Sequence, residues 1–421
     1  MERYNEYKDS GVQWLGEIPS HWELRKMKYT FCERSQKGFP NEPLLAATQN
    51  HGVIKKSDYE NRTVEATKNL DTLKLVEKGD FVISLRSFQG GIEYSYCRGI
   101  ISPAYTVLKA HHLTEPYFKH LAKSPSFIDL LKSSVTGIRE GQNIDYNKLK
   151  VEFMPIPTIE EQQAIATYLD TITAKIDEAI VQQQKMIDLL NERKQIIINN
   201  AVTKGLNPDA PMKDSGVDWI GEIPEHWEIT KLKKKSKIIL GKMLSNAPGN
   251  KYEYFCAKDV HYGCADDSDL KQMFFSDTER EQYKVNYGDM LIVEGGAGAG
   301  GCAIYKGTKT AYIQNSIMIV RGNEDMVNEY ICSFMQSINQ RGYVEFICNK
   351  ATIPHFTKEK AGGVNIAVPP IEEQNKIVKY IEKMCAPIDN AISSAAKQIS
   401  LLQERKQIII NDVVTGKVKV S

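Results

Sequence analysis

The stretch KDSGVQWLGEIPSHWEL at residues 8–24 returns as KDSGVDWIGEIPEHWEI at residues 213–229, with 13 of 17 positions identical. A second stretch, LLNERKQIIINNAVT at residues 189–203, returns as LLQERKQIIINDVVT at residues 401–415, with 12 of 15 positions identical. Between these repeated blocks the two halves of the chain diverge almost completely. Because the period has the size of a domain, the pattern indicates duplication of a whole unit and not a solenoid. It predicts one scaffold that presents two unlike recognition surfaces.

Composition excludes several classes of protein. The 421 residues carry a net charge of +1 and eight cysteines without a Cys-x-x-Cys pair, so neither a disulfide framework nor a zinc site is indicated. The chain begins without an apolar signal core and has no apolar run of about 20 residues, so we expect a cytoplasmic protein that does not enter a membrane. Basic and acidic residues balance in both halves, so DNA could be bound only through local patches.

Both repeated blocks at the ends of the halves predict long helices. Residues 158–200 place apolar side chains at alternating spacings of four and three, and the second copy repeats this pattern over residues 377–409. Sustained heptads predict a coiled-coil seam, and about 40 helical residues span about 60 Å, so each helix is the obvious partner of the other. Thr158 and Glu161 form a capping box, and Pro370 replaces the threonine in the second copy. Pro387, inside the second helix, predicts a kink or local break near residues 385–387.

The divergent segments predict two mixed domains. Residues 25–156 and 230–368 alternate short β-rich runs, such as 80–85 and 289–293, with helical stretches such as 115–124 and 324–338. The same order of elements occurs in both segments despite the lost identity. We therefore expect two α+β domains of similar size.

Motifs for catalysis are weak or missing. Gly296–Gly301 matches G-x-G-x-x-G, but it runs into the β-rich residues 302–305 and no acidic residue follows at the ribose-binding position, so a turn between strands is favoured over a nucleotide site. There is no phosphate-binding loop with lysine, no HExxH sequence and no nucleophile elbow. The pair His111 and His112 lies in a polar connection, where a surface loop is the simplest interpretation. We expect no catalytic residue and no metal site.

All four tryptophans belong to the repeated blocks, together with His21 and His226. Identical residues in both copies cannot explain two different specificities. We therefore expect the tryptophans to pack each domain onto the helices and not to stack on bases.

Polar residues suggest where nucleic acid could bind, although solvated surface polarity would look the same. Basic residues after each repeated block could contact phosphates and position DNA without reading it. These are Arg25, Lys26, Lys28, Lys231, Lys233, Lys234 and Lys235. Loops between the elements are better candidates for reading bases, because Arg, Gln and Asn can make bidentate contacts to base edges. The candidates are Arg86, Ser87, Gln89, Arg139, Gln142 and Asn143 in the first domain, and Lys350, Thr352 and His355 in the second.

The paired DSGVxW[LI]GEIPxHWE block, the IEEQ helix start and the ERKQIIIN helix end resemble the specificity subunit of type I restriction-modification systems over essentially the full chain. The resemblance implies a target recognition domain at residues 1–156, a spacer helix at 157–205, a second recognition domain with its linker at 206–368, and a second spacer helix with a tail at 369–421. It implies that the helices form an antiparallel coiled coil that separates and joins the domains with pseudo-two-fold symmetry. The two chain ends would then lie close together.

The function implied by the resemblance is DNA recognition without catalysis. Each recognition domain would read one half of an asymmetric, bipartite DNA target in the major groove. The helices would set the gap and dock two modification subunits, which methylate adenine with S-adenosylmethionine, and restriction subunits that use ATP and Mg²⁺ would join them. These cofactors would belong to the partners. Two alternatives stay open: a coiled-coil scaffold that binds only proteins, and a nucleotide-dependent enzyme built on Gly296–Gly301.

Overall fold

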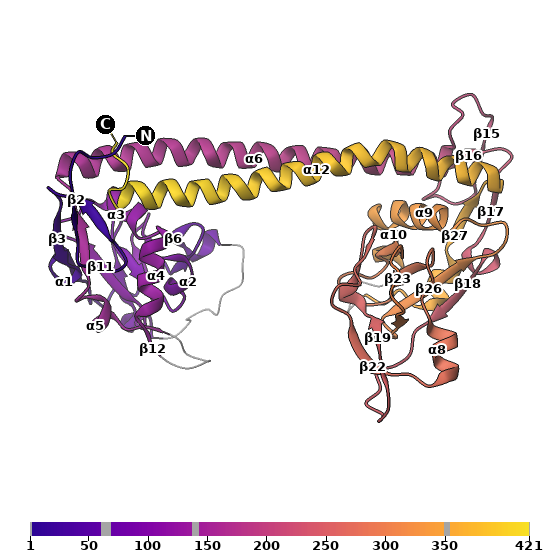
Figure 1. The fold of residues 1–421 in the computed structure, drawn as a ribbon, viewed down its shortest axis with the longest axis horizontal. Helices are drawn as coiled ribbons and strands as arrows, with labels where there is room; N and C mark the ends of the chain where they lie inside the picture. The colour runs from indigo at the N-terminus through magenta and orange to yellow at the C-terminus, as the bar shows by residue number, and fades with distance from the viewer. Residues whose placement is uncertain (1, 60–68, 137–142, 349–353, 421) are drawn as a thin grey trace. The chain divides into compact units, whose positions relative to one another are not determined.

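The computed structural model describes residues 2–59, 69–136, 143–348 and 354–420 (Figure 1). Its contacts divide the chain into two compact units, one formed by residues 1–184 and 396–421 and the other by residues 185–395. Each unit holds one mixed domain and one part of each long helix, α6 (Ile159–Lys204) and α12 (Ile371–Val414). The prediction of a mixed α and β chain is confirmed. Among the described residues, no helix is long and apolar enough to cross a membrane.

The first unit is built on a four-stranded antiparallel sheet. Its strands are β4 (Phe31–Glu33), β11 (Thr106–Ala110), β8 (Phe81–Ile83) and β9 (Glu93–Tyr94), in that order. Helices α3 (Glu115–Leu121) and α4 (Pro125–Ser133) contribute apolar side chains to the same core as the sheet. Strand β3 (Glu23–Lys26) pairs with β14 (Phe153–Ile156), which leads into α6.

The second unit repeats this topology. Its sheet has the order β18 (Ser236–Leu240), β26 (Ile317–Gly322), β23 (Met290–Val293) and β24 (Cys302–Ile304). Strand β17 (Glu228–Lys231) pairs with β27 (Asn365–Val368), which leads into α12. The equal order predicted for the two divergent segments holds for these strands, whereas the smaller elements between them differ.

The smaller elements complete the two units. The first unit also contains β1 (Tyr7–Asp9), β2 (Glu17–Pro19), α1 (Met27–Thr30), β5 (Leu45–Thr48), β6 (Gly52–Lys55), η1 (Lys56–Asp58), η2 (Leu70–Thr72), β7 (Lys74–Val76), α2 (Ser87–Gly90), β10 (Gly99–Ile101), β12 (Val135–Thr136), β13 (Asn143–Ile144) and α5 (Tyr146–Leu149). The second unit also contains β15 (Met212–Asp214), β16 (Glu222–Pro224), α7 (Leu232–Lys235), β19 (Lys251–Phe255), η3 (Ala257–Asp259), β20 (Val260–His261), β21 (Cys264–Ala265), β22 (Lys271–Phe274), α8 (Asp277–Tyr283), β25 (Tyr312–Ile313), α9 (Asn328–Gln340), α10 (Tyr343–Ile347) and α11 (Lys358–Gly363).

The predicted start of the first long helix is confirmed. The Thr158 amide donates to Glu161 Oε2, and the Glu161 amide donates to Thr158 Oγ1, both at 3.2 Å, which is the reciprocal capping box. In the second copy Pro370 directly precedes α12, and its carbonyl accepts hydrogen bonds from the amides of residues 373 and 374.

The predicted local break at Pro387 is wrong, because α12 continues through this residue. Pro387 is exposed, whereas Ile381, Cys385 and Ile388 are buried along one face of the helix. Proline removes one backbone hydrogen bond, and water can reach the carbonyl group that loses its partner on the exposed face. The apolar contacts of the buried face hold the helix together.

Within each unit the two long helices run antiparallel. In the first unit Trp22 contacts the start of α6 through Glu161 and the end of α12 near Gly416, and further along Lys406 Nζ lies 2.6 Å from Asp177 Oδ2. In the second unit Lys194 Nζ lies 2.6 Å from Asp389 Oδ1. Since 406 − 194 and 389 − 177 both equal 212, the same ion pair is made twice with the helices exchanged.

The repeated tryptophans pack each domain onto the helices, as predicted. Trp22 and Trp227 are 0% and 1% exposed and belong to cores that include residues of α6 and α12. Trp14 packs edge-on against Phe127, and Trp219 packs against Tyr343. The repeated blocks at residues 8–24 and 213–229 therefore have a structural role in both units.

Two further kinds of contact, which we call anchors, attach each domain to the long helices and were not predicted. Tyr117 donates a hydrogen bond from its hydroxyl to the Val414 carbonyl at 2.9 Å, and Tyr330 Oη lies 3.3 Å from the Val202 carbonyl oxygen. Val202 and Val414 are again 212 residues apart. The hydroxyl of Tyr330 also donates to the Ala367 carbonyl at 2.7 Å.

The glutamine of each IEEQ sequence makes the second anchor. The side-chain oxygens of Gln162 and Gln374 accept hydrogen bonds from the backbone amides of Thr114 and Val327, at 2.7 and 2.9 Å. Both glutamines are fully buried. Each long helix is thereby tied to the segment that precedes α3 or α9.

The two chain ends meet within the first unit, as the resemblance implies. The Lys419 amide donates to the Glu2 carbonyl at 2.9 Å, and the Tyr7 hydroxyl donates to the Lys417 carbonyl at 3.3 Å.

Candidate nucleic-acid interface

In the first unit, the predicted loops meet at the end of strand β8. Arg86 precedes helix α2, and α2 contacts β13, which begins at Asn143. Arg86 and Gln89 have exposed side chains. Ser87 is 1% exposed, and its hydroxyl oxygen accepts a hydrogen bond from the Ser84 amide at 2.8 Å, so it shapes the turn from within. Arg139 and Gln142 lie outside the described residues.

In the second unit the matching edge contains the glycine-rich segment. Strands β23 and β24 are antiparallel neighbours, and Gly296–Gly301 connects them, so the predicted turn is confirmed. No helix follows the segment, and a nucleotide site of the proposed kind needs a helix N-terminus. The alternative of an enzyme built on these glycines is therefore wrong.

His355 lies against this glycine segment. It forms an isolated bridge with Gly295, and the Gly296 amide donates to the Pro354 carbonyl at 3.2 Å. The imidazole side chain is exposed. Lys350 and Thr352 lie outside the described residues. The loop after β23 and the loop before α11 are therefore brought together, as are the loops after β8 and before α5 in the first unit.

Because the two sheets have the same strand order, Ser84–Gly91 and Glu294–Gly301 occupy equivalent places. We did not predict the glycine segment as part of a recognition edge. The signal that could have found it is the alignment of the β-rich runs at residues 80–85 and 289–293. A glycine-rich backbone can approach a ligand closely, whereas Arg86 and Gln89 reach out with side chains.

The predicted phosphate contacts fall into two groups. In the first unit Arg25 pairs with Glu23 at 2.8 Å, while the ammonium groups of Lys26 and Lys28 lie over the rings of Phe153 and Tyr29. In the second unit Lys235 lies 2.6 Å from Asp325, and this hydrogen bond raises the pKa of the lysine.

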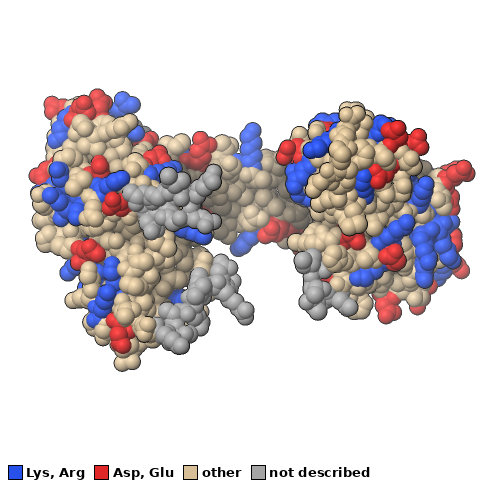
Figure 2. All heavy atoms as spheres, turned by 90° about the horizontal axis from the view of Figure 1, so that it is seen from below, with Lys and Arg blue, Asp and Glu red and all other residues tan. Residues whose placement is uncertain are grey.

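The exposed members of the second group are Lys231, Lys233 and Lys234. Lys233 and Lys358 line a groove of about 400 Å³ between α7 and α11. Glu359 also lines this groove. Helix α11 begins three residues after His355, so the groove lies near the Gly296–Gly301 segment. Figure 2 shows Lys and Arg interspersed with Asp and Glu on the face in view, as the balanced charge predicts.

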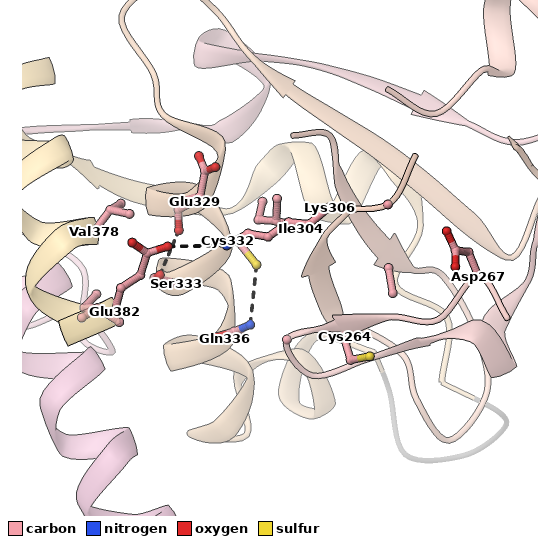
Figure 3. Close-up of a pocket in the computed structure, with 14 residues that line it drawn as sticks. Cys264, Asp267, Ile304, Lys306, Glu329, Cys332, Ser333, Gln336, Val378 and Glu382 are labelled. Atoms are coloured by element: carbon pink, nitrogen blue, oxygen red, sulfur yellow. Dashed lines mark hydrogen bonds and ion pairs between the residues drawn. The ribbon is translucent and has the colours of Figure 1, made fainter. Parts of the chain in front are cut away.

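A separate pocket of about 370 Å³ in the second unit lies between the β20–β21 hairpin, α9 and α12 (Figure 3). The Sγ atom of Cys332 lies 3.9 Å from that of Cys302, and Gln336 Nε2 lies 3.6 Å from the Cys332 sulfur. The hydrogen bond with Cys332 and burial raise the pKa of Cys302, so this thiol is not activated as a nucleophile. Within the described part of the chain, no group of three or more His, Cys, Asp or Glu side chains could hold a metal ion. His111 and His112 are exposed in the connection after β11, as predicted.

Comparisons with known proteins found similar sequences and a similar fold. Residues 224–398 match the family model of the type I restriction modification DNA specificity domain. A relative from Methanocaldococcus jannaschii, provisionally named type I restriction enzyme MjaX specificity subunit, is 26% identical over 439 residues, with 96% of both chains covered. The MjaVIII specificity subunit of the same organism is 25% identical, over 82% of this chain and 80% of its own length.

A solved structure shares the fold. It was described under "Structural basis underlying complex assembly and conformational transition of the type I R-M system" and has a TM-score of 0.70 at 16% sequence identity, covering 95% of this chain and 99% of its own. Over most of its length the chain is similar to type I restriction-modification specificity subunits. The family model that matches residues 224–398 describes a DNA specificity domain.

Proposed function

We propose that each unit's mixed domain reads one half of a bipartite, asymmetric DNA target in the major groove. The observation that carries the proposal is the contrast between matched anchors and unlike loops. Tyr117 and Tyr330 bind corresponding carbonyl groups of the long helices, while Arg86 and Gln89 stand where the second unit has glycines. Equal attachment with different exposed groups suits two readers of different sequences.

The long helices would act as an antiparallel coiled-coil spacer with pseudo-two-fold symmetry. Exchange of the same Lys–Asp pair between the helices supports this symmetry. A helix of 46 residues spans about 70 Å, which is long enough to hold two domains one DNA turn, about 34 Å, apart.

The same symmetry would present two equivalent docking surfaces to two modification subunits, which would methylate adenines. Restriction subunits would join this core. S-adenosylmethionine, ATP and Mg²⁺ would be bound by those partners and not by this chain.

The experiment is to co-express the chain with its modification subunit and to map methylated adenines across the genome, with and without this chain. We expect one motif with two defined halves and a fixed gap, and only when the chain is present. Insertion of one heptad into both helices adds about 10 Å to each and should lengthen the gap by about 3 base pairs without changing the halves. An unchanged gap would refute the spacer role. Methylation that does not depend on the chain would favour a protein scaffold without DNA specificity.

The balanced charge gives a second expectation for the isolated chain. Basic and acidic residues are balanced over the chain, and Lys235 is already paired with Asp325. We expect weak binding to a duplex with the mapped motif, and much tighter binding after addition of modification subunits. Fluorescence anisotropy at fixed salt would measure both, and tight, motif-specific binding by the chain alone would contradict this expectation.

A further inference from the structure

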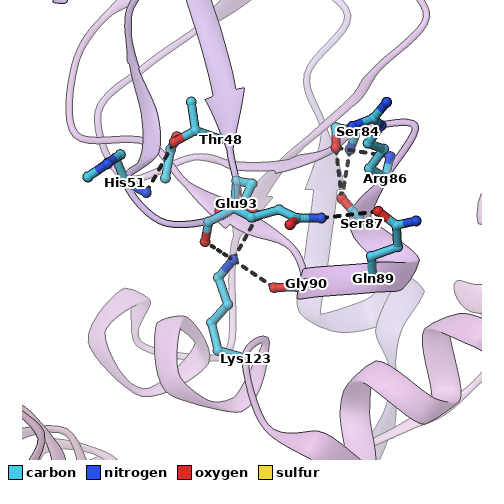
Figure 4. A network of polar contacts seen from close by, with 11 residues as sticks. Thr48, His51, Ser84, Arg86, Ser87, Gln89, Gly90, Glu93 and Lys123 are labelled. Carbon is cyan, nitrogen blue, oxygen red and sulfur yellow. Dashed lines mark hydrogen bonds and ion pairs between the residues drawn. The ribbon is translucent and has the colours of Figure 1, made fainter. Parts of the chain in front are cut away.

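A hairpin turn that the sequence did not single out lies beside α2 in the first unit (Figure 4). Residues 49–51 connect β5 and β6, and the side chains of Gln49, Asn50 and His51 are exposed. Thr48 shapes the turn, because its hydroxyl donates to the Gly52 carbonyl at 3.0 Å and accepts from the His51 amide at 3.1 Å. Three polar side chains are thereby presented at one tip.

The turn touches a candidate base-reading residue directly. Gln49 Nε2 donates to Gln89 Oε1 at 3.4 Å. The contact uses one lone pair of Gln89 Oε1. The second lone pair of this oxygen can still accept a hydrogen bond, and the NH₂ group of the same amide can still donate one. A donor and an acceptor side by side on one amide match the N7 and N6 positions of adenine in the major groove.

An ion pair between the half-buried Lys123 and the buried Glu93 holds the turn and α2 together. Lys123 Nζ donates to the Gly90 carbonyl at 2.8 Å, to the Gln49 carbonyl at 3.3 Å and to Glu93 Oε1 at 2.7 Å. These contacts use all three donors of the ammonium group. Glu93 is 2% exposed, and its second carboxylate oxygen has no hydrogen-bond partner among the described residues. The lysine is the group that compensates the buried carboxylate.

Two glycines at the end of α2 allow close packing against the turn and against the end of α3. A Cβ on Gly90 would lie 3.0 Å from Gln49 Cγ, so the helix end packs directly on the turn. Gly91 has φ +87, and a Cβ there would collide with the Ala122 carbonyl oxygen just before Lys123. The turn, α2 and the end of α3 therefore form one packed unit.

We propose that the turn at residues 49–51 and Gln89 form a composite surface that reads an adenine-containing base pair in the half-site of the first domain. Lys123 and Glu93 are positioning residues, because they fix the two backbones that carry the glutamines and do not themselves face the base. This proposal rests on the proposed function, since it names the ligand group for one of the two readers.

The test uses the full complex with cognate modification subunits and maps the methylated motif by sequencing. For Gln89→Leu and Gln49→Leu we expect a loss of discrimination of about tenfold or more at one position of one half-site. Lys123→Met should relax the same position, and Lys123→Arg should restore it in part. The other half-site is an internal control, and Lys132→Met, which removes an exposed lysine of α4, should leave both halves unchanged.

The outcomes separate the possible failures. An unchanged motif in Gln49→Leu and Gln89→Leu would overturn the proposal while leaving two-domain recognition intact. If Lys123→Met abolishes recognition of both half-sites together, the ion pair supports folding only. The Gln49→Leu variant, which changes an exposed side chain, then decides whether the turn reads a base. If the unmodified complex methylates no bipartite motif, the proposed function itself fails.

Discussion

The two units differ least where they hold the long helices and most where the central strand of each sheet ends. Several anchors repeat: His21 binds Glu161 as His226 binds Glu373, at 2.9 and 2.8 Å. At the strand ends, Arg86 and Gln89 have no counterpart among the glycines of the second unit. The duplication therefore kept the attachment and changed the exposed edge, which is what a scaffold with two specificities requires.

One buried aspartate–arginine contact is conserved in part between the two units. Asp80 and Asp289 stand at equivalent positions before the central strands, and each binds an arginine through two hydrogen bonds. However, Arg34 follows β4, whereas Arg321 belongs to β26. The buried carboxylate was retained, and its arginine comes from a different neighbouring strand.

The largest expected effect comes from removing the buried tryptophans, which tests whether the two units are attached to the long helices in the same way. Trp22→Ala and Trp227→Ala should each cost about 3–5 kcal/mol, because each side chain is fully buried between a domain and the helices. Thermal and urea unfolding monitored by circular dichroism would measure the loss. Phe346→Ala is the matched control, since this ring is 81% exposed and its removal should change stability by less than about 0.5 kcal/mol. Strongly unequal losses for the two tryptophans would show that the anchors are not equivalent.

The second test concerns the proline that interrupts the repeated helix pattern. Pro387 stands where the first copy has Lys175, since 387 − 175 equals 212. Pro387→Lys should restore a backbone hydrogen bond and stabilise the chain by up to about 3 kcal/mol. The reverse change, Lys175→Pro in α6, should destabilise it by about the same amount. If Pro387→Lys brings no gain in the free energy of unfolding, α12 has adapted to its proline.

The outcome at Pro387 illustrates what the sequence could predict. Heptads and capping residues are local signals, so both long helices and the Thr158 box were predictable, but the burial that accompanies the continuous α12 at Pro387 is tertiary. The partnership of Gln49 with Gln89 joins residues 40 positions apart on different elements, so no spacing rule points to it. Ser87 was predicted as a base-reading candidate from its residue type, and only the fold shows that its hydroxyl faces inward.

The hydroxyl groups of Tyr117 and Tyr330 allow the free energy of attachment to be compared between the two units. Tyr117→Phe should cost about 1 kcal/mol, because the change leaves one buried carbonyl oxygen without its donor. Tyr330→Phe should cost at least as much, since that hydroxyl lies near the carbonyl oxygens of both Ala367 and Val202. Urea unfolding at fixed temperature measures both losses. A negligible effect for either variant would mean that this anchor contributes packing alone.

The smallest expected effect is the pH dependence contributed by His120, which has no histidine counterpart in the second unit. His120 binds Asp170 at 2.9 Å, and Ser333 takes the equivalent place three residues after the tyrosine anchor of the second unit. Burial lowers the pKa of His120, while Asp170 partly opposes this shift and Lys119 and Lys406 add to it. The folded state therefore binds a proton less readily than the unfolded chain, whose histidine has a pKa of about 6.5.

Stability from this group should be complete above about pH 6.5 and should fall as the pH drops below that value. The urea midpoint of the unmodified chain, measured from pH 7.5 to 5, should decline more steeply than that of His120→Gln. The difference should be smaller than the effect of Tyr117→Phe. Ser333→Ala is the matched control in the second unit and should leave the slope unchanged. Equal slopes for His120→Gln and the unmodified chain would show that the histidine is not the source of the asymmetry.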